Sequence, residues 1–376
     1  MNVYFDNAAT TRVREEAAQL MLRVMTEDYG NPSSTHYFGR RAKEILDTAR
    51  ENVAAAIGAD ASEIYFTSGG TEADNWAILS GAEKMRHVGK HIIISAYEHD
   101  AINKPCAYLE DRGWEITRLS PDEGGYITAD AVKNALRDDT VLVSVMFVNN
   151  ELGTINPIRE IANVVHKNSK ALMHTDAVQA LCKTMISVSS LGVDLMSVSS
   201  HKIHGPKGCG ALYMKKGIKL PAHIMGGAQE NTLRAGTEAL PAIAGFGEAA
   251  RLGKKEMAQS IKSMQAVKDT CIRLLSEITE VVFIGDGKAP HILSISLPGY
   301  KSEVLMNWLE REGICVSKSS ACKKGKRSHV LEAMGLDAKI IDGAVRISFS
   351  KYSTVEEAEY FAIKLREASQ KILKVL

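Results

Sequence analysis

Short apolar runs alternate with longer segments of helical period along the first two thirds of the chain. The runs are rich in β-branched residues and end in polar or glycine-containing turns, which predicts buried strands. The segments between them predict amphipathic helices that connect parallel strands. The expected strands cover residues 64–67, 91–95, 115–119, 141–148, 171–175, 195–199 and 210–214. The expected helices include residues 40–57, 72–86, 129–136 and 158–168. This part is therefore predicted to be a doubly wound α/β domain with a mainly parallel seven-stranded sheet.

A long helical segment at residues 240–278 separates this pattern from a different one. It has no proline after Pro241 and exceeds an ordinary globular helix, so we expect it to bridge two domains. The expected strands beyond it are residues 292–297, 315–317 and 344–349, and the helices are 302–312, 328–334 and 355–374. We expect a large domain over residues 15–255, and a smaller α/β domain formed by residues 1–14 and 256–376.

Composition argues against a nucleic-acid-binding, a membrane-spanning or a metal-binding protein. Lys and Arg total 46 against 45 Asp and Glu, so no charge excess favours a nucleic-acid partner or a membrane surface. No apolar run approaches the roughly 20 residues that span a bilayer, and the first residues lack a signal-peptide pattern. The six cysteines form no C-x-x-C pair. We therefore expect a cytoplasmic protein without a bound metal.

Two polar segments follow expected strands and carry candidate chemistry. TSGGTE at residues 67–72 opens a helix with small residues, which suits either a phosphate cradle or an ordinary helix cap. HTDAVQ at residues 174–179 places Asp176 at the carboxyl edge of the sheet, where ligands of open α/β sheets bind. Asp176 could hold a protonated ring nitrogen or cap the next helix, and both interpretations stay open.

Lys202 follows the next expected strand, in the run SSHKIHGPKG at residues 199–208. A single lysine in such a place is usually a solvated surface residue. Here it shares a sheet edge with Asp176, with several hydroxyls and with the TSGGTE segment. An amine, a carboxylate and anion-binding donors are the set that pyridoxal phosphate requires, so the sequence predicts a site for this cofactor.

Eight sequence runs resemble the cysteine desulfurases, the NifS/IscS-like members of the class V aminotransferase group. They are DNAATT (6–11), GNPSS (30–34), TSGGTEADN (67–75), VNNELG (148–153), HTDAVQ (174–179), SSHKIHGPKG (199–208), GGAQENTLRAGTE (226–238) and SSACKKGKRSHVL (319–331). The resemblance implies a homodimeric fold-type I enzyme that depends on pyridoxal phosphate. It implies that L-cysteine is the substrate and L-alanine the product, with the sulfur left as a persulfide for an acceptor protein.

The resemblance also implies roles for individual residues around the cofactor. Lys202 matches the lysine that binds the cofactor covalently, and Asp176 matches the partner of its ring nitrogen. Gln179 matches the residue that contacts the phenolic oxygen. The phosphate-binding positions are matched by Gly70, Thr71, Ser199 and His201, with Ser200 beside them.

Further matches concern the substrate and the second subunit. His99 matches the histidine that stacks on the cofactor ring and transfers protons, and Asn150 lies at a position near cofactor and substrate. Arg346 matches the arginine that pairs with the substrate carboxylate. Thr237 matches a threonine that reaches the phosphate of the other subunit, and Cys322 matches the cysteine that accepts sulfur.

The surroundings of Cys322 agree with this role. The residue lies in a polar run with five cationic side chains and no acid between residues 318 and 327. Nearby cations stabilise the thiolate, which is the form that attacks sulfur. Cys315 in the run GICV is expected instead to be a buried structural residue. The same basic run could be no more than a solvated face.

Other functions compete with that of a cysteine desulfurase. A selenocysteine lyase or an aminotransferase of a small amino acid would belong to the same group. A non-catalytic binding protein would have little reason to keep Lys202, Asp176, Gln179 and Cys322 together. A nucleotide-binding dehydrogenase lacks its G-x-G-x-x-G motif. The sulfur acceptor, an iron–sulfur scaffold or a tRNA-thiolation enzyme, is left open by the sequence.

Overall fold

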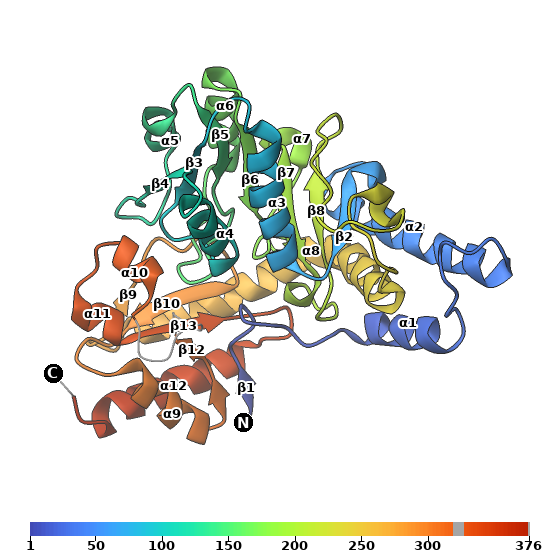
Figure 1. The fold of residues 1–376 in the computed structure, drawn as a ribbon. Coiled ribbons are helices and arrows are strands. Elements are labelled where there is room, and N and C mark those ends of the chain that lie inside the picture. The colour runs from blue at the N-terminus through green and yellow to red at the C-terminus, as the bar shows by residue number, and fades with distance from the viewer. Residues whose placement is uncertain (319–326, 375–376) are drawn as a thin grey trace.

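A computed structural model describes residues 1–318 and 327–374. It is a mixed α/β structure with one large sheet and a smaller one in separate parts of the molecule (Figure 1). This confirms the predicted fold class. None of the helices within these ranges is long and apolar enough to cross a bilayer.

The large sheet has seven strands in the order β2-β8-β7-β6-β5-β3-β4. Their bounds are β2 Ile64–Thr67, β3 His91–Ser95, β4 Glu115–Leu119, β5 Thr140–Ser144, β6 Leu172–Asp176, β7 Leu195–Ser199 and β8 Gly210–Met214. Strands β3 to β7 pair in parallel, whereas β8 runs antiparallel to both of its neighbours. The carboxyl ends of β5, β6 and β7 consequently meet at one edge, where ligands of open sheets bind.

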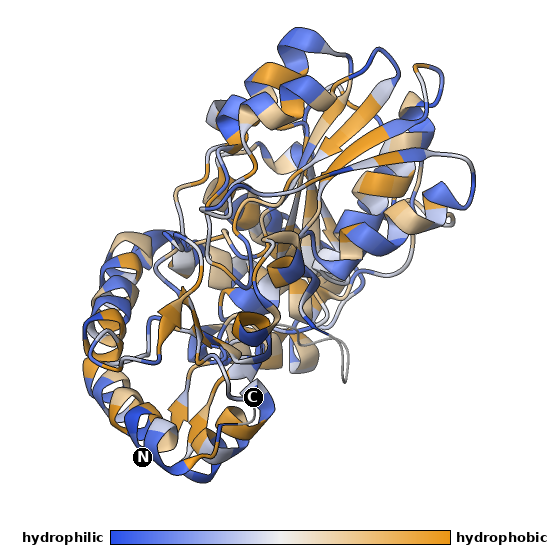
Figure 2. Cartoon of the chain, turned by 90° about the vertical axis from the view of Figure 1, so that its left-hand side faces the viewer, coloured by the Kyte–Doolittle hydropathy of each residue, from blue (hydrophilic) through white to orange (hydrophobic). Residues whose placement is uncertain are grey.

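Helices cover both faces of this sheet because alternate residues of each strand point to opposite sides. Ile92 and Ile94 pack into the apolar cluster that contains α3 and α4, whereas Ile93 packs into the cluster on the other face. Figure 2 shows the resulting apolar centre of the sheet. The helices of this part are α1 Glu15–Thr26, α2 Tyr37–Ile57, α3 Gly70–Met85, α4 Asp100–Glu110, α5 Ala129–Ala135, α6 Ile158–Asn168 and α7 Val188–Leu191.

The smaller part has its own sheet and its own apolar cluster. Four antiparallel strands lie in the order β12-β13-β10-β9, and a separate parallel pair joins β1 to β11. These strands are β1 Val3–Tyr4, β9 Val282–Phe283, β10 Ile292–Ser296, β11 Ile314–Cys315, β12 Ser317–Lys318 and β13 Ala344–Ser348. The helices are α9 Ser302–Arg311, α10 His329–Ala333, α11 Ala338–Asp342 and α12 Val355–Lys371.

Two segments connect the parts. Helix α8 (Leu240–Leu275) contributes Phe246 to the large cluster and Cys271 to the small one, as expected of a bridging helix. The N-terminal segment also belongs to both, because Phe5 packs edge-on against Phe349 with ring centroids 5.1 Å apart, whereas Ala8 lies in the large cluster. The domain boundaries at residues 14/15 and 255/256 stay a prediction.

Three expectations about local structure were wrong. Strand β5 ends at Ser144 rather than at residue 148. Residues 145–148 remain apolar because they are buried in the loop beyond the strand end. The single strand expected at 315–317 is two short strands in different sheets. Cys315 is exposed rather than buried, because Ile314 and Val316 take the inward positions of the alternation.

Candidate active site

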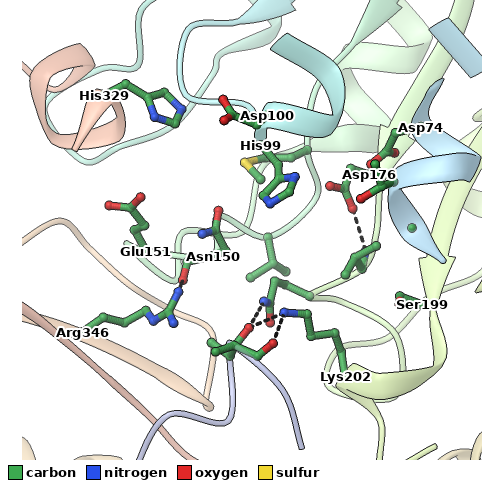
Figure 3. Close-up of a pocket in the computed structure, with 18 of the residues that line it drawn as sticks. Asp74, His99, Asp100, Asn150, Glu151, Asp176, Ser199, Lys202, His329 and Arg346 are labelled. Carbon is green, nitrogen blue, oxygen red and sulfur yellow. Dashed lines mark hydrogen bonds between the residues drawn. The ribbon is translucent and has the colours of Figure 1, made fainter. Parts of the chain in front are cut away.

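A cavity of about 920 Å³ opens at the carboxyl edge of the parallel strands. Ten of the residues predicted from the sequence line it: Gly70, Thr71, His99, Asn150, Asp176, Gln179, Ser199, His201, Lys202 and Arg346. Gly70 and Thr71 begin helix α3, Arg346 belongs to β13, and the others come from strand ends and loops around the large sheet. Figure 3 shows Arg346 on one side of this space and Asp176 and Lys202 on the other. The fold therefore gathers residues from positions 70 to 346 in one site.

Lys202 enters the cavity from the short turn η2 (Ser200–Lys202), directly after β7. Its Nζ donates hydrogen bonds to the backbone oxygens of Ala8, at 2.6 Å, and Ala9, at 2.8 Å. The N-terminal segment is itself tied to this turn, because the Thr11 N–H donates to the His201 carbonyl at 3.0 Å. The amine is thus held beside residues that approach from the smaller part of the molecule.

Asp176 is the last residue of β6 and only 6% exposed. Its Oδ1 accepts the Val178 N–H at 2.8 Å, which fixes the carboxyl group at the cavity wall (Figure 3). Burial raises its pKa, and the Val178 N–H, His99 and Lys202 oppose that rise. Asp74 of α3 lies on the same wall, and its pKa is raised by burial and by the nearby Asp176. Two buried acids thus face the cavity, and His99 and Lys202 act on Asp176.

The N-terminus of α3 forms a wall beside Ser199. A Cβ added at Gly70 would lie 2.7 Å from Val178 Cγ2, so the approach of this helix to the β6 loop requires glycine. The first-turn N–H groups of a helix have no intrahelical acceptor and favour an anion. Nearby, Ser200 Oγ is buried and lacks a hydrogen-bond partner among the described residues. His201 is neutral at physiological pH, because burial chiefly lowers its pKa to about 4.

His99 is the N-cap of α4. Its Nδ1 accepts the Ala101 N–H at 3.1 Å, which leaves Nε2 as the nitrogen able to exchange a proton with the cavity. Figure 3 places the ring between Asp176 and Asn150. This position in the cavity suits a group that transfers protons to and from a bound substrate.

Arg346 is 3% exposed and forms the opposite wall. One terminal nitrogen donates to Asp6 at 2.9 Å and the other to the Asn150 backbone oxygen at 3.1 Å. Its Nε is buried without a partner among the described residues. A fixed guanidinium at a cavity wall is suited to bind a carboxylate.

Several buried acids near the cavity were not predicted as site residues. Glu151 receives a 2.5 Å hydrogen bond from Ser328 Oγ, and burial raises its pKa to about 8. Burial likewise raises the pKa of Glu98 to about 8, against hydrogen bonds from Ser95 and the Met146 N–H. Glu98 precedes His99 and Glu151 follows Asn150 in the sequence. Only the packing of the folded chain shows that both glutamates are buried.

Three predicted residues are not in the cavity lining. Ser200 lies behind it, as described above. Thr237 is exposed in the loop before α8 and is not part of the cavity lining. Cys322 lies outside the described residues. Within residues 1–318 and 327–374, no cluster of three His, Cys, Asp or Glu side chains could hold a metal ion.

Comparison with known proteins gives full-length matches. The family model "Aminotransferase class-V" matches residues 3–361. The chain is 43% identical to a protein of Methanosarcina thermophila named cysteine desulfurase IscS, over 98% of this chain and 92% of that protein. Among solved structures it resembles a NifS-like protein, with a TM-score of 0.94, 37% identity and coverage of 99% and 100% of the two chains. It also resembles a structure described as SspA in complex with cysteine, with a TM-score of 0.82, 33% identity and 94% and 100% coverage.

Proposed function

The chain belongs to the aminotransferase class-V family, and we propose that it is a cysteine desulfurase that uses pyridoxal phosphate. Its similarity to proteins of that name extends over nearly the whole chain. The single structural observation that supports the activity most is the convergence of Lys202, Asp176 and Arg346 on one cavity. An amine, a buried acid and a buried guanidinium match the three polar ends of a cofactor with an amino-acid substrate.

The residues of the cavity fit pyridoxal phosphate. When bound, the cofactor supplies an electron sink that weakens bonds at the substrate Cα. Lys202 would attach it covalently. Asp176, which is buried and fixed at the cavity wall by the Val178 N–H, would pair with the ring nitrogen. Gln179 would contact the phenolic oxygen.

The phosphate would lie at the N-terminus of α3. The first-turn donors of this helix, with Ser199 beside them in the cavity lining, mark this end of the cavity as an anion site. The residues that would hold the phosphate are Gly70, Thr71, Ser199, Ser200 and His201.

L-Cysteine would bind between the two walls. Arg346 would hold its carboxylate with Asn150 nearby, since the Asn150 backbone already fixes the guanidinium. His99 Nε2 would exchange protons at the substrate. The Cys322 thiolate would attack the substrate sulfur, so that the C–S bond breaks, a Cys322 persulfide forms and L-alanine leaves.

The active unit is a homodimer in this proposal. The support is the position of Thr237, which is exposed and away from its own cavity and is therefore available to the phosphate site of a second subunit. Sedimentation tests it, and a fully active monomer with tightly bound cofactor would contradict it. The persulfide then passes to an acceptor protein, either an iron–sulfur scaffold or a tRNA-thiolation enzyme.

Incubation of purified protein with L-cysteine tests the activity. We expect stoichiometric alanine and sulfide in the presence of a thiol reductant, and a persulfide on Cys322 by mass spectrometry without it. L-Selenocysteine, and L-alanine with 2-oxoglutarate, are the matched alternative substrates. A preference for selenocysteine, or transamination without persulfide, would replace desulfuration by one of the two alternatives named above.

A further inference from the structure

Lys183 is a buried lysine to which the proposed reaction assigns no role. It lies in the turn after β6 and is 7% exposed. Its Nζ donates to Gln179 Oε1 at 3.5 Å. Burial lowers its pKa to about 7, and Lys202 is the next largest cause. A lysine that is costly to bury beside a second lysine requires an explanation.

A chain of hydrogen bonds joins the two lysines. Lys183 donates to Oε1 of Gln179, and Nε2 of the same amide donates to the Ala8 carbonyl at 2.9 Å. That carbonyl also accepts Lys202 Nζ at 2.6 Å. Both ends of the Gln179 amide and the cofactor-binding amine are therefore set by one continuous network.

The network decides which way the Gln179 amide faces. A protonated lysine can donate but not accept, so Lys183 in its ammonium form stabilises the orientation with Oε1 turned toward it. The amide nitrogen then points toward Ala8 and has a second hydrogen for a group in the cavity, which Gln179 lines. A flipped amide would present an oxygen to the phenolic oxygen of the cofactor and repel it.

The charges around Lys183 are mainly positive. Lys202 of η2 and Arg346 of β13 both lower its pKa. His291, in the segment before β10, is 1% exposed and also lies near Lys183. His291 has its pKa depressed by burial and then by Lys183. Cys182, the neighbour in sequence, acts in the opposite direction on Lys183.

The nearby acids are engaged elsewhere. A small cavity of about 30 Å³ touches both Lys183 and Lys202, and it also touches Glu256. This glutamate bonds to Arg14 at 2.9 Å and Lys351 at 2.7 Å. Asp176 acts on Lys202 from the other side. His201 and His204 also face Lys183, and both have low pKa values of about 4, chiefly from burial.

We propose that Lys183 is a positioning residue of the cofactor site, which fixes the Gln179 amide and places positive charge near Lys202. The inference rests on the proposed function, because it requires the cofactor on Lys202. The charge makes the Lys202 amine a weaker base, so that it takes up and releases protons nearer to neutral pH.

Three substitutions separate the two effects. Lys183→Met removes charge and donor, Lys183→Gln removes the charge but keeps a donor, and Lys183→Arg keeps both. Each protein is reconstituted with pyridoxal phosphate, and its visible absorbance is titrated with pH. We expect the Met and Gln variants to raise the titration midpoint by about one pH unit, with the Arg variant near wild type.

Cofactor dissociation provides the second readout. Only Lys183→Met should weaken retention, by about fivefold for one lost hydrogen bond. The exposed Lys167→Met on α6 is the matched control and should change neither measurement. Met and Gln variants that titrate with wild type would overturn the inference. If Met does not fold, Gln alone decides the effect of charge. A wild-type protein without borohydride-reducible cofactor on Lys202 would instead overturn the proposed function.

Discussion

The two walls of the cavity are built differently. The wall of the large sheet carries Asp176 at the end of β6, Lys202 in the turn after β7, and Asp74 in helix α3, which packs on this sheet. The opposite wall carries Arg346, which is fixed by Asp6 and by the Asn150 backbone from distant parts of the chain. The geometry of the first wall depends on the large sheet and the helix packed on it. The geometry of the second depends on how the smaller part packs against the large one.

This difference matches the division of labour in the proposed reaction. A cofactor that stays bound needs a preorganised wall, and parallel strands with buried residues on both faces provide it. A substrate that binds reversibly needs a fixed, accessible charge such as the Arg346 guanidinium. Substitutions in the sheet wall should therefore abolish cofactor binding, whereas those in the Arg346 wall should weaken substrate binding alone.

The largest effect is expected for Lys202→Ala. Without the amine there is no covalent attachment, and turnover should fall at least about a thousandfold. Borohydride reduction followed by peptide mapping should locate the cofactor on Lys202 in wild type and on no lysine in the variant. Cofactor trapped on Lys183 or Lys207 would contradict the assignment of this wall.

The sheet wall was largely predictable from sequence. Asp176 and Lys202 each follow an apolar run, and parallel strands bring their carboxyl ends to one edge whatever the detailed packing. The predicted bounds of β7 agree with the structure at both ends, which places Lys202 correctly. The roles of these residues nevertheless stay predictions.

The opposite wall was less predictable because its contacts join residues far apart in the chain. The pairing of Arg346 with Asp6 spans 340 residues and depends on the N-terminal segment lying across β13. The burial of Glu98, Glu151 and Lys183 follows from packing between layers, which hydrophobic periodicity does not report. The exposure of Cys315 shows the same limit. Its apolar neighbours Ile314 and Val316 are buried, so the sequence suggested a buried run although Cys315 points outward.

The second prediction concerns Cys322, which lies outside the described residues of both walls. Cys322→Ala should retain the cofactor and its colour change with L-cysteine, because both walls are intact. Alanine formation should fall by at least about a hundredfold, since no protein thiolate attacks the sulfur. Stopped-flow absorbance and alanine analysis measure the two steps separately. Alanine release at the wild-type rate would remove Cys322 from the proposal.

The third prediction tests the Arg346 wall. Arg346→Lys keeps the charge but loses the planar fork, and we expect kcat/KM for L-cysteine to fall about a hundredfold, or ~3 kcal/mol. Cofactor content should stay at the wild-type level. Arg327→Lys, an exposed cation that also lines the cavity, is the control and should change kcat/KM little. Loss of cofactor in Arg346→Lys would show that the walls are not separable.

The smallest effect compares two buried glutamates, Glu151 near Arg346 of one wall and Glu98 near Asp176 of the other. The pKa of Glu98 and that of Glu151 are both raised to about 8, chiefly by burial. Their contribution to stability is fully present below the unfolded pKa of about 4.5. It is lost as pH rises toward 8, because the unfolded state gives up its proton first. Each group should therefore make the protein less stable by about 2 kcal/mol at pH 8 than at pH 6.

Urea unfolding at pH 6 and pH 8 measures this slope at equal cofactor saturation. Glu98→Gln and Glu151→Gln should each remove part of it, and the exposed Glu160→Gln should not. The two walls differ in their neighbours, because Arg346 lowers the pKa of Glu151, whereas Asp176 raises that of Glu98. Adding Arg346→Gln should therefore steepen the slope assigned to Glu151 and leave that of Glu98 unchanged. If Arg346→Gln changed the slopes of both glutamates equally, the two walls would be electrostatically coupled. That result would contradict the difference between the walls.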